Sequence, residues 1–196
     1  TVLFACLIGS SLLFYAGWEL IIVGLLCVLF AFLYTTGPYP LSYNGWGDIL
    51  VIVFFGFVPV GGTYYVQALT WTTDTTIASL ICGLLIDTLL VVNNYRDREA
   101  DARSGKRTVI VRFGEKFGSY LYLMLGMTAS LLCFWFLFEG HLYAALLPLL
   151  YLIPHFLTWK RMVRIHSGKK LNSILGETSR NMLLMGILLS IGFFLN

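Results

Sequence analysis

The chain has 196 residues, of which 58% are apolar and only 12% are charged, with a net charge of +3. Soluble domains carry about 25% charged residues, so this chain cannot cover a globular surface with polar groups. A soluble fold and a disordered chain are therefore excluded, and four cysteines are too few for a disulfide-rich mini-protein. The composition predicts an all-α, polytopic integral membrane protein.

Apolar stretches separated by short polar breaks recur along the whole chain. A helix of about 20 apolar residues crosses the bilayer core. Seven stretches approach that length, at residues 2–16, 19–34, 48–67, 76–94, 117–138, 141–158 and 180–195. We expect a single membrane domain over residues 1–196. Because the chain opens inside an apolar run without Met, we also expect it to be part of a longer protein.

The basic residues predict the topology. All 13 Lys and Arg residues lie in two segments, 96–116 and 160–180, and the two spans between them carry none. Two crossings return the chain to the same side, so both segments share one face, which the positive-inside rule makes cytoplasmic. By the same count, loop 35–47 is cytoplasmic, whereas residues 70–75 and the C-terminus face outward.

A cluster of amides and carboxylates follows the fourth span. If the helix continues past Asn94, then Asn93, Asn94, Asp97 and Asp101 share one face, because positions three and four apart are neighbours. Arg96 points mostly away from this face. Two carboxylates one turn apart repel unless a cation lies between them. Mg²⁺ fits, because it binds one or two carboxylates together with phosphate and water oxygens.

Basic residues follow at the end of this predicted helix. Gly105 is placed to end it, and Lys106, Arg107 and Arg112 come next, close enough to reach the phosphates that such a metal would hold. Spacing alone leaves two interpretations open, a diphosphate–metal site or a solvated, salt-bridged helix end. The paired amides favour the first, because a buried Asn needs hydrogen-bond partners.

Two other classes of protein compete with an enzyme. A transporter or channel would spread charges or broken helices through several spans, whereas here the acidic cluster lies at one membrane face. In a non-catalytic membrane scaffold, Asp97 and Asp101 would be replaceable without loss of activity.

The sequence resembles the UbiA superfamily of intramembrane prenyltransferases. The stretch N-N-Y-R-D-R-E-A-D-A-R-S-G-K-R-T followed by V-x-V-R-F-G resembles the second aspartate-rich motif of that family. Its form is most similar to the menaquinone-pathway branch, which acts on 1,4-dihydroxy-2-naphthoate. Two further stretches, residues 34–48 and 169–178, are similar to a loop with its following helix and to the last cytoplasmic loop of the family.

The resemblance implies a reaction and the residues for it. A polyprenyl group passes from its diphosphate to 1,4-dihydroxy-2-naphthoate, with release of pyrophosphate, in a Mg²⁺-dependent reaction. Other acceptors are alternatives (4-hydroxybenzoate, homogentisate, or an acceptor of the haem or chlorophyll type). We expect an integral protein of a bacterial inner membrane with a cytoplasmic catalytic face, and no nucleic-acid partner. The implied site comprises the metal ligands Asp97 and Asp101, catalytic together with Asn94, and the substrate-binding residues Asn93, Arg96, Lys106, Arg107 and Asn172.

The resemblance also contains one large departure. The family has about nine transmembrane helices and a first aspartate-rich motif, of N-D-x-x-x-D type, before the third helix. No second D-x-x-x-D stretch occurs in this chain. We therefore expect it to begin at the third helix of that fold, with half of the metal site, and to be a fragment or inactive alone.

A few other polar residues are weaker candidates. Asp87 lies inside an apolar span, where carboxylates are rare and usually functional or partnered. Asp48 either approaches the aromatic substrate or serves as the N-cap of the span that follows it. Tyr64 and Tyr65 are expected near the outer end of their span, far from the metal, which counts against a role there.

Overall fold

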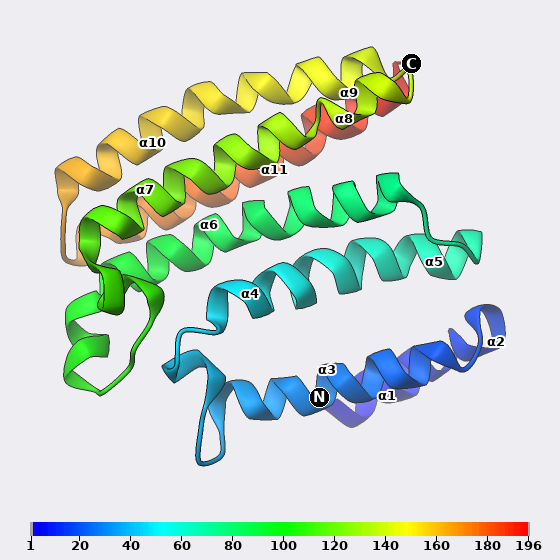
Figure 1. Cartoon of the computed structure of the whole chain (residues 1–196), viewed down its shortest axis with the longest axis horizontal. Helices are drawn as coiled ribbons and strands as arrows, with labels where there is room; N and C mark the ends of the chain where they lie inside the picture. The colour runs from blue at the N-terminus through cyan, green and yellow to red at the C-terminus, as the bar shows by residue number, and fades with distance from the viewer. Residues whose placement is uncertain (1, 196) are drawn as a thin grey trace.

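The computed structural model describes residues 2–195, and within this range helices are the only regular secondary structure. The helices lie side by side, most of them close to parallel or antiparallel (Figure 1). This arrangement confirms the all-α membrane bundle predicted from the composition.

Five helices among the described residues are long and apolar enough to cross a membrane: Gly47–Ala68, Thr73–Arg103, Val109–Phe138, Leu142–Ile165 and Lys169–Phe194. The first joins α4 (Gly47–Val51), a π-helical segment (Ile52–Gly61) and α5 (Gly62–Ala68), and the second is α6 (Thr73–Arg103). The third joins α7 (Val109–Leu132) to α8 (Trp135–Phe138). The last two contain α9 (Leu142–Leu146) with α10 (Leu152–Ile165), and α11 (Asn172–Phe194).

The first two predicted spans take a different form. Residues 2–16 are divided into α1 (Val2–Ser10) and α2 (Leu13–Ala16), and α3 (Glu19–Thr35) has only 17 residues. The division falls at Ser10 and Ser11, whose hydroxyls bond back to the carbonyls of Leu7 and Ile8 at 2.7 Å. Such local bonds compete with the helical ladder. These helices form a hairpin along one side of the bundle (Figure 1).

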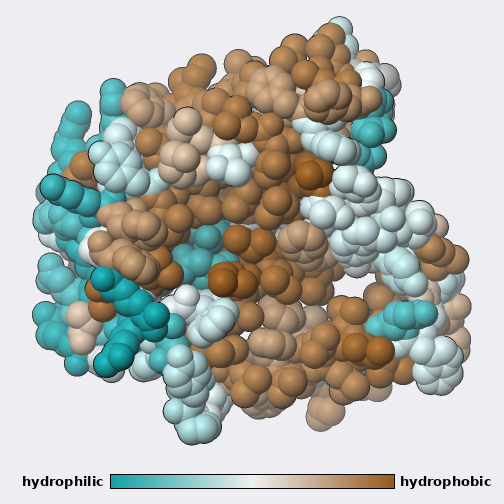
Figure 2. All heavy atoms as spheres, in the orientation of Figure 1, coloured by the Kyte–Doolittle hydropathy of each residue, from teal (hydrophilic) through white to brown (hydrophobic). Residues whose placement is uncertain are grey.

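The loops gather at two ends of the bundle. Loops 36–46, 104–108 and 166–168 lie at one end, here called the polar end, and loops 69–72 and 139–141 lie at the other (Figure 1). Figure 2 shows hydrophilic residues concentrated at the polar end and a hydrophobic band across the middle. The prediction that both basic segments and loop 35–47 share one face is confirmed.

The central helix α6 carries the cluster out of the membrane. Its 31 residues span roughly 46 Å at 1.5 Å per residue, which exceeds the ~30 Å hydrocarbon core. At its start, the Thr72 hydroxyl accepts a bond from the Thr75 amide. At its end, Gly105 adopts a φ of 80°, which glycine tolerates best. The last turns of α6 therefore project beyond the bilayer at the polar end.

Two glycines bring the π-helical segment close to α6. A Cβ on Gly56 would lie 2.5 Å from the Ser79 carbonyl oxygen, and one on Gly83 would lie 2.9 Å from the Ile52 Cα. Pro59 in this segment has no N–H to donate, which disfavours regular α-helical bonding there. The close contact fixes α4 against α6 and so sets the width of the space between them.

Candidate active site

Arg96 links the acidic helix end to α11. Its guanidinium donates to Asn93 Oδ1 at 2.8 Å, to Asn172 Oδ1 at 2.9 Å and to both carboxyl oxygens of Asp97 at 2.5 and 2.7 Å. Helical spacing directs Arg96 away from this face, but its long side chain reaches back across the turn. The structure therefore places four of the predicted residues, Asn93, Arg96, Asp97 and Asn172, in one polar network.

Lys106 forms an ion pair with the second aspartate, Asp101. Its ammonium lies 3.2 Å from Asp101 Oδ1, its backbone N–H donates to the Asp101 carbonyl at 2.9 Å, and its charge also acts on Asp97. The ammonium lies 5.2 Å from the centre of the Tyr43 ring, in cation–π range. The Asp101 carboxylate is thus paired with Lys106, whereas the Asp97 carboxylate is paired with Arg96, which also bonds Asn172 of α11.

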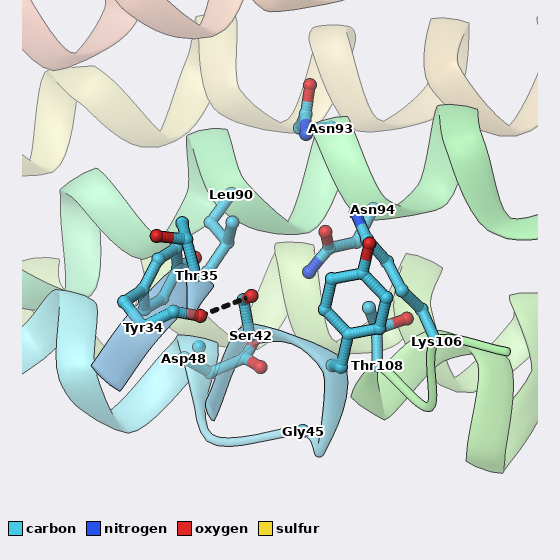
Figure 3. A pocket seen from close by; sticks show the side chains of 12 residues that line it. Tyr34, Thr35, Ser42, Gly45, Asp48, Leu90, Asn93, Asn94, Lys106 and Thr108 are labelled. Atoms are coloured by element: carbon cyan, nitrogen blue, oxygen red, sulfur yellow. Dashed lines mark hydrogen bonds between the residues drawn. The ribbon is translucent and has the colours of Figure 1, made fainter. Parts of the chain in front are cut away.

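A cavity of about 350 Å³ opens beside this cluster. Its walls come from the end of α3, loop 36–46, the start of α4, the middle of α6 and the segment 106–108 (Figure 3). Asn94, only 9% exposed, points from α6 into the cavity, whereas the Asn93 side chain points to the other side of the helix (Figure 3). The lining residues are Tyr34, Thr35, Ser42, Tyr43, Gly45, Gly47, Asp48, Leu90, Asn93, Asn94, Lys106 and Thr108.

The predicted site residues differ in their place relative to the cavity. Asn94 and Lys106 line the cavity, and Asn93 contributes to its wall. Asp101 lies next to it through its ion pair with Lys106, and Asp97 lies one helical turn earlier on α6, paired with Arg96. Arg96, Arg107 and Asn172 lie outside the lining.

Loop 36–46 is held against the segment that follows α6. The Arg107 backbone N–H donates to the Tyr43 carbonyl, and the Arg112 guanidinium donates to the Asn44 carbonyl, both at 2.7 Å. Within the loop, the Ser42 hydroxyl donates to the Tyr34 carbonyl at 2.6 Å. These bonds hold the loop against one side of the cavity. Arg107 contributes to this contact through its backbone N–H.

Several cavity residues were absent from the predicted site, namely Tyr34, Thr35, Ser42, Leu90 and Thr108. Tyr34, Thr35 and Ser42 lie in residues 34–48, which resemble a family loop. That resemblance alone does not say which residues of the loop line a cavity. The N-cap interpretation of Asp48 is wrong, because α4 begins at Gly47 and makes no side-chain capping bond. Tyr64 and Tyr65 lie in α5, near the opposite end from the cavity.

The donor set suits a magnesium ion that a substrate helps to hold. Among the described residues, no group of three or more His, Cys, Asp or Glu side chains could bind a metal by itself. Asp97 and Asp101 supply two carboxylates one helical turn apart, each paired with a basic side chain. Two carboxylates are the usual protein share of a Mg²⁺ site completed by phosphate and water oxygens. These residues fit a diphosphate-bound metal.

Lys106 and Arg107 can be separated by substitution. In the complete protein, we expect Lys106→Gln to weaken the binding of pyrophosphate about tenfold, because a charge-assisted contact to phosphate oxygens is lost. Arg107→Gln removes the same charge from an exposed side chain outside the lining and should change this affinity much less. Pyrophosphate titrations of the two variants make the comparison. Equal affinities would contradict the cavity as an anion site.

Spanning helices with an acidic pair, a lysine and a polar cavity at one end define an integral membrane protein whose site suits an anionic ligand. The chain belongs to the UbiA prenyltransferase family, whose sequence profile matches residues 1–193.

Individual relatives agree with this membership. The chain is 34% identical to the 1,4-dihydroxy-2-naphthoate octaprenyltransferase of Haemophilus influenzae, over 95% of the chain and 59% of the relative. It is 33% identical to the enzyme of that name from Escherichia coli, over 100% of the chain and 66% of the relative. It is 43% identical to the enzyme of that name from Mycobacterium tuberculosis, over 61% of the chain and 40% of the relative. The chain thus spans less than two thirds of these relatives. No solved structure matches it significantly.

Proposed function

We propose that the protein containing this chain transfers a polyprenyl group from its diphosphate to 1,4-dihydroxy-2-naphthoate, with release of pyrophosphate. The observation that carries the proposal is an acidic pair one helical turn apart, Asp97 paired with Arg96 and Asp101 with Lys106, beside a cavity lined by Asn94 and Lys106. Relatives named for this acceptor support the choice of substrate.

The barrier to such a transfer lies in breaking the allylic C–O bond, which leaves positive charge on the prenyl carbon and negative charge on pyrophosphate. Preorganised charges at the leaving group give electrostatic stabilisation, often the largest catalytic contribution. Lys106 and the Asn94 amide would contact the diphosphate. Arg96 holds Asp97 in position from the side of α11.

Asp97 and Asp101 would hold Mg²⁺, which neutralises charge on the leaving group when bound. Members of this family are generally metal-dependent. The polar end would face the cytoplasm of a bacterial cell, since it carries all 13 basic residues. The prenyl tail would then extend along the apolar helices into the bilayer.

The test is an acceptor panel with membranes containing the complete protein. We expect prenylated product with 1,4-dihydroxy-2-naphthoate, and none above background with 4-hydroxybenzoate or homogentisate. A chelator should abolish the reaction, and added Mg²⁺ should restore it. Product with another acceptor alone would correct the substrate, and full turnover in excess chelator would refute the metal-dependent mechanism.

A further inference from the structure

Asp48 is a carboxylate in a cavity wall that no other described residue hydrogen-bonds. Both its carboxyl oxygens are shielded from solvent, and neither bonds to another described residue. The side chain projects from the first turn of α4 beside the Tyr34 and Ser42 side of the cavity (Figure 3). Burying a polar group without a partner is costly, so native structures usually supply one from protein, water or ligand.

The groups around Asp48 do not neutralise it. The other acidic side chain close enough to act on it is Asp87, 1% exposed on α6, whose Oδ1 also lacks a partner. Two neighbouring acids repel when both are charged. The Tyr34 hydroxyl lies 3.6 Å from the Cβ position of Gly47, the residue before Asp48. These neighbours favour a ligand that brings a hydrogen-bond donor, not a further anion.

The cavity has two chemically different sides. Lys106 and Asn94 lie on one side, and Asp48 and Tyr34 lie on the other (Figure 3). Its volume of about 350 Å³ is at the lower end of the range for small-molecule sites. It suits a small ring system, whereas a polyprenyl tail would need a longer apolar surface. Tyr34, Tyr43 and Leu90 supply the flat and apolar contacts that an aromatic ring prefers.

We propose that Asp48 receives a ring hydroxyl of the aromatic acceptor and takes its proton as the ring attacks. This inference rests on the proposed prenyl transfer and assigns the acceptor to the Asp48 side of the cavity. The diphosphate occupies the Lys106 side, so the reacting prenyl carbon lies between the two.

The proton and the electrons balance in this step. The hydroxyl proton moves to the Asp48 carboxylate, and the oxygen electron pair enters the ring, which forms the new C–C bond. The allylic C–O bond breaks, and its electron pair leaves with pyrophosphate. The resulting ring ketone regains aromaticity when the attacked carbon releases CO2 or gives its proton to the departing pyrophosphate. The ring oxygen then takes back the proton held by Asp48.

The test uses Asp48→Asn in the complete protein, because the amide keeps the shape and a hydrogen-bond acceptor but cannot take the proton. We expect kcat to fall about 100-fold or more, the usual contribution of a general base. The KM for the prenyl diphosphate should stay within about twofold of wild type. Thermal stabilisation by prenyl diphosphate with Mg²⁺ should also persist, which shows that the variant is folded.

The matched control is Asp74→Asn, in the first turn of α6 at the opposite end of the bundle. Asp74 accepts a bond from the Trp135 indole at 2.7 Å, which an Asn oxygen can also accept, so kcat should be unchanged. Monomethyl ethers of the acceptor add a second readout. With the ether that blocks the relevant hydroxyl, wild type and Asp48→Asn should react equally slowly.

The outcomes separate this inference from the proposed function. If wild type prenylates the acceptor and Asp48→Asn keeps its kcat, the role of Asp48 is refuted while the function stands. If wild type prenylates no aromatic acceptor, the function itself is refuted. A variant that loses prenyl diphosphate stabilisation would also contradict the inference, because Asp48 would then serve the other side of the cavity.

Discussion

Asp97→Asn and Asp101→Asn, each introduced into the complete protein, are expected to reduce turnover about 1,000-fold. Each amide preserves the size of the side chain but removes one of the two negative charges at this end of α6. With one carboxylate left, a metal–diphosphate complex would lose half of the charge that this chain offers it. Release of pyrophosphate and formation of prenylated product, measured together, report the loss.

Glu99→Gln is the matched control for these variants. Glu99 lies between the two aspartates in sequence but is exposed on another side of α6. The same loss of charge there should leave turnover close to wild type. If the variant with both Asp97 and Asp101 replaced turned over at the wild-type rate, the two carboxylates would be dispensable. That result would favour the alternative interpretations, a non-catalytic scaffold role for this segment or a solvated, salt-bridged helix end. A melting temperature measured for each variant separates loss of chemistry from loss of fold.

The acidic face of α6 could be predicted because it depends only on local periodicity. Asn94, Asp97 and Asp101 recur at helical spacing, and the helix that carries them is continuous. The shared face of the basic segments could be predicted for a similar reason, since it requires only a count of crossings. Both inferences use neighbours in sequence or the alternation of spans.

The cavity could not be predicted in this way. Tyr34, Asp48, Asn94 and Lys106 come from four parts of the chain, and only the packing of α3, α4 and α6 brings them together. The reach of Arg96 was also unpredictable, because it depends on where Asn172 begins α11. The division of residues 2–16 escaped a hydropathy argument because two serines scarcely change the average of an apolar run.

The width of the cavity depends on the glycine contact between α6 and the π-helical segment, so Gly83→Val is expected to be strongly destabilising. A Cβ at Gly83 would lie 2.9 Å from both the Cα and the carbonyl oxygen of Ile52, and backbone atoms cannot rotate away. Overpacking costs typically 1–3 kcal/mol, and contact with backbone places this variant at about 3 kcal/mol or more. The melting temperature in detergent should therefore fall markedly.

Gly186→Val provides the control, because Gly186 is exposed on α11 and has no heavy atom within 4 Å of its Cβ position. The same change of side chain there fills open space that lipid or detergent occupies, and valine is slightly better than glycine in a helix. Equal melting temperatures for the two variants would show that α6 does not depend on this contact.

Kinetics of the Gly83→Val protein that remains folded give a second readout. The clash with Ile52 should push α4, and with it Asp48, away from α6, whereas Asn94 and Lys106 keep their places on α6 and the segment after it. The KM for the aromatic acceptor should therefore rise more than the KM for the prenyl diphosphate.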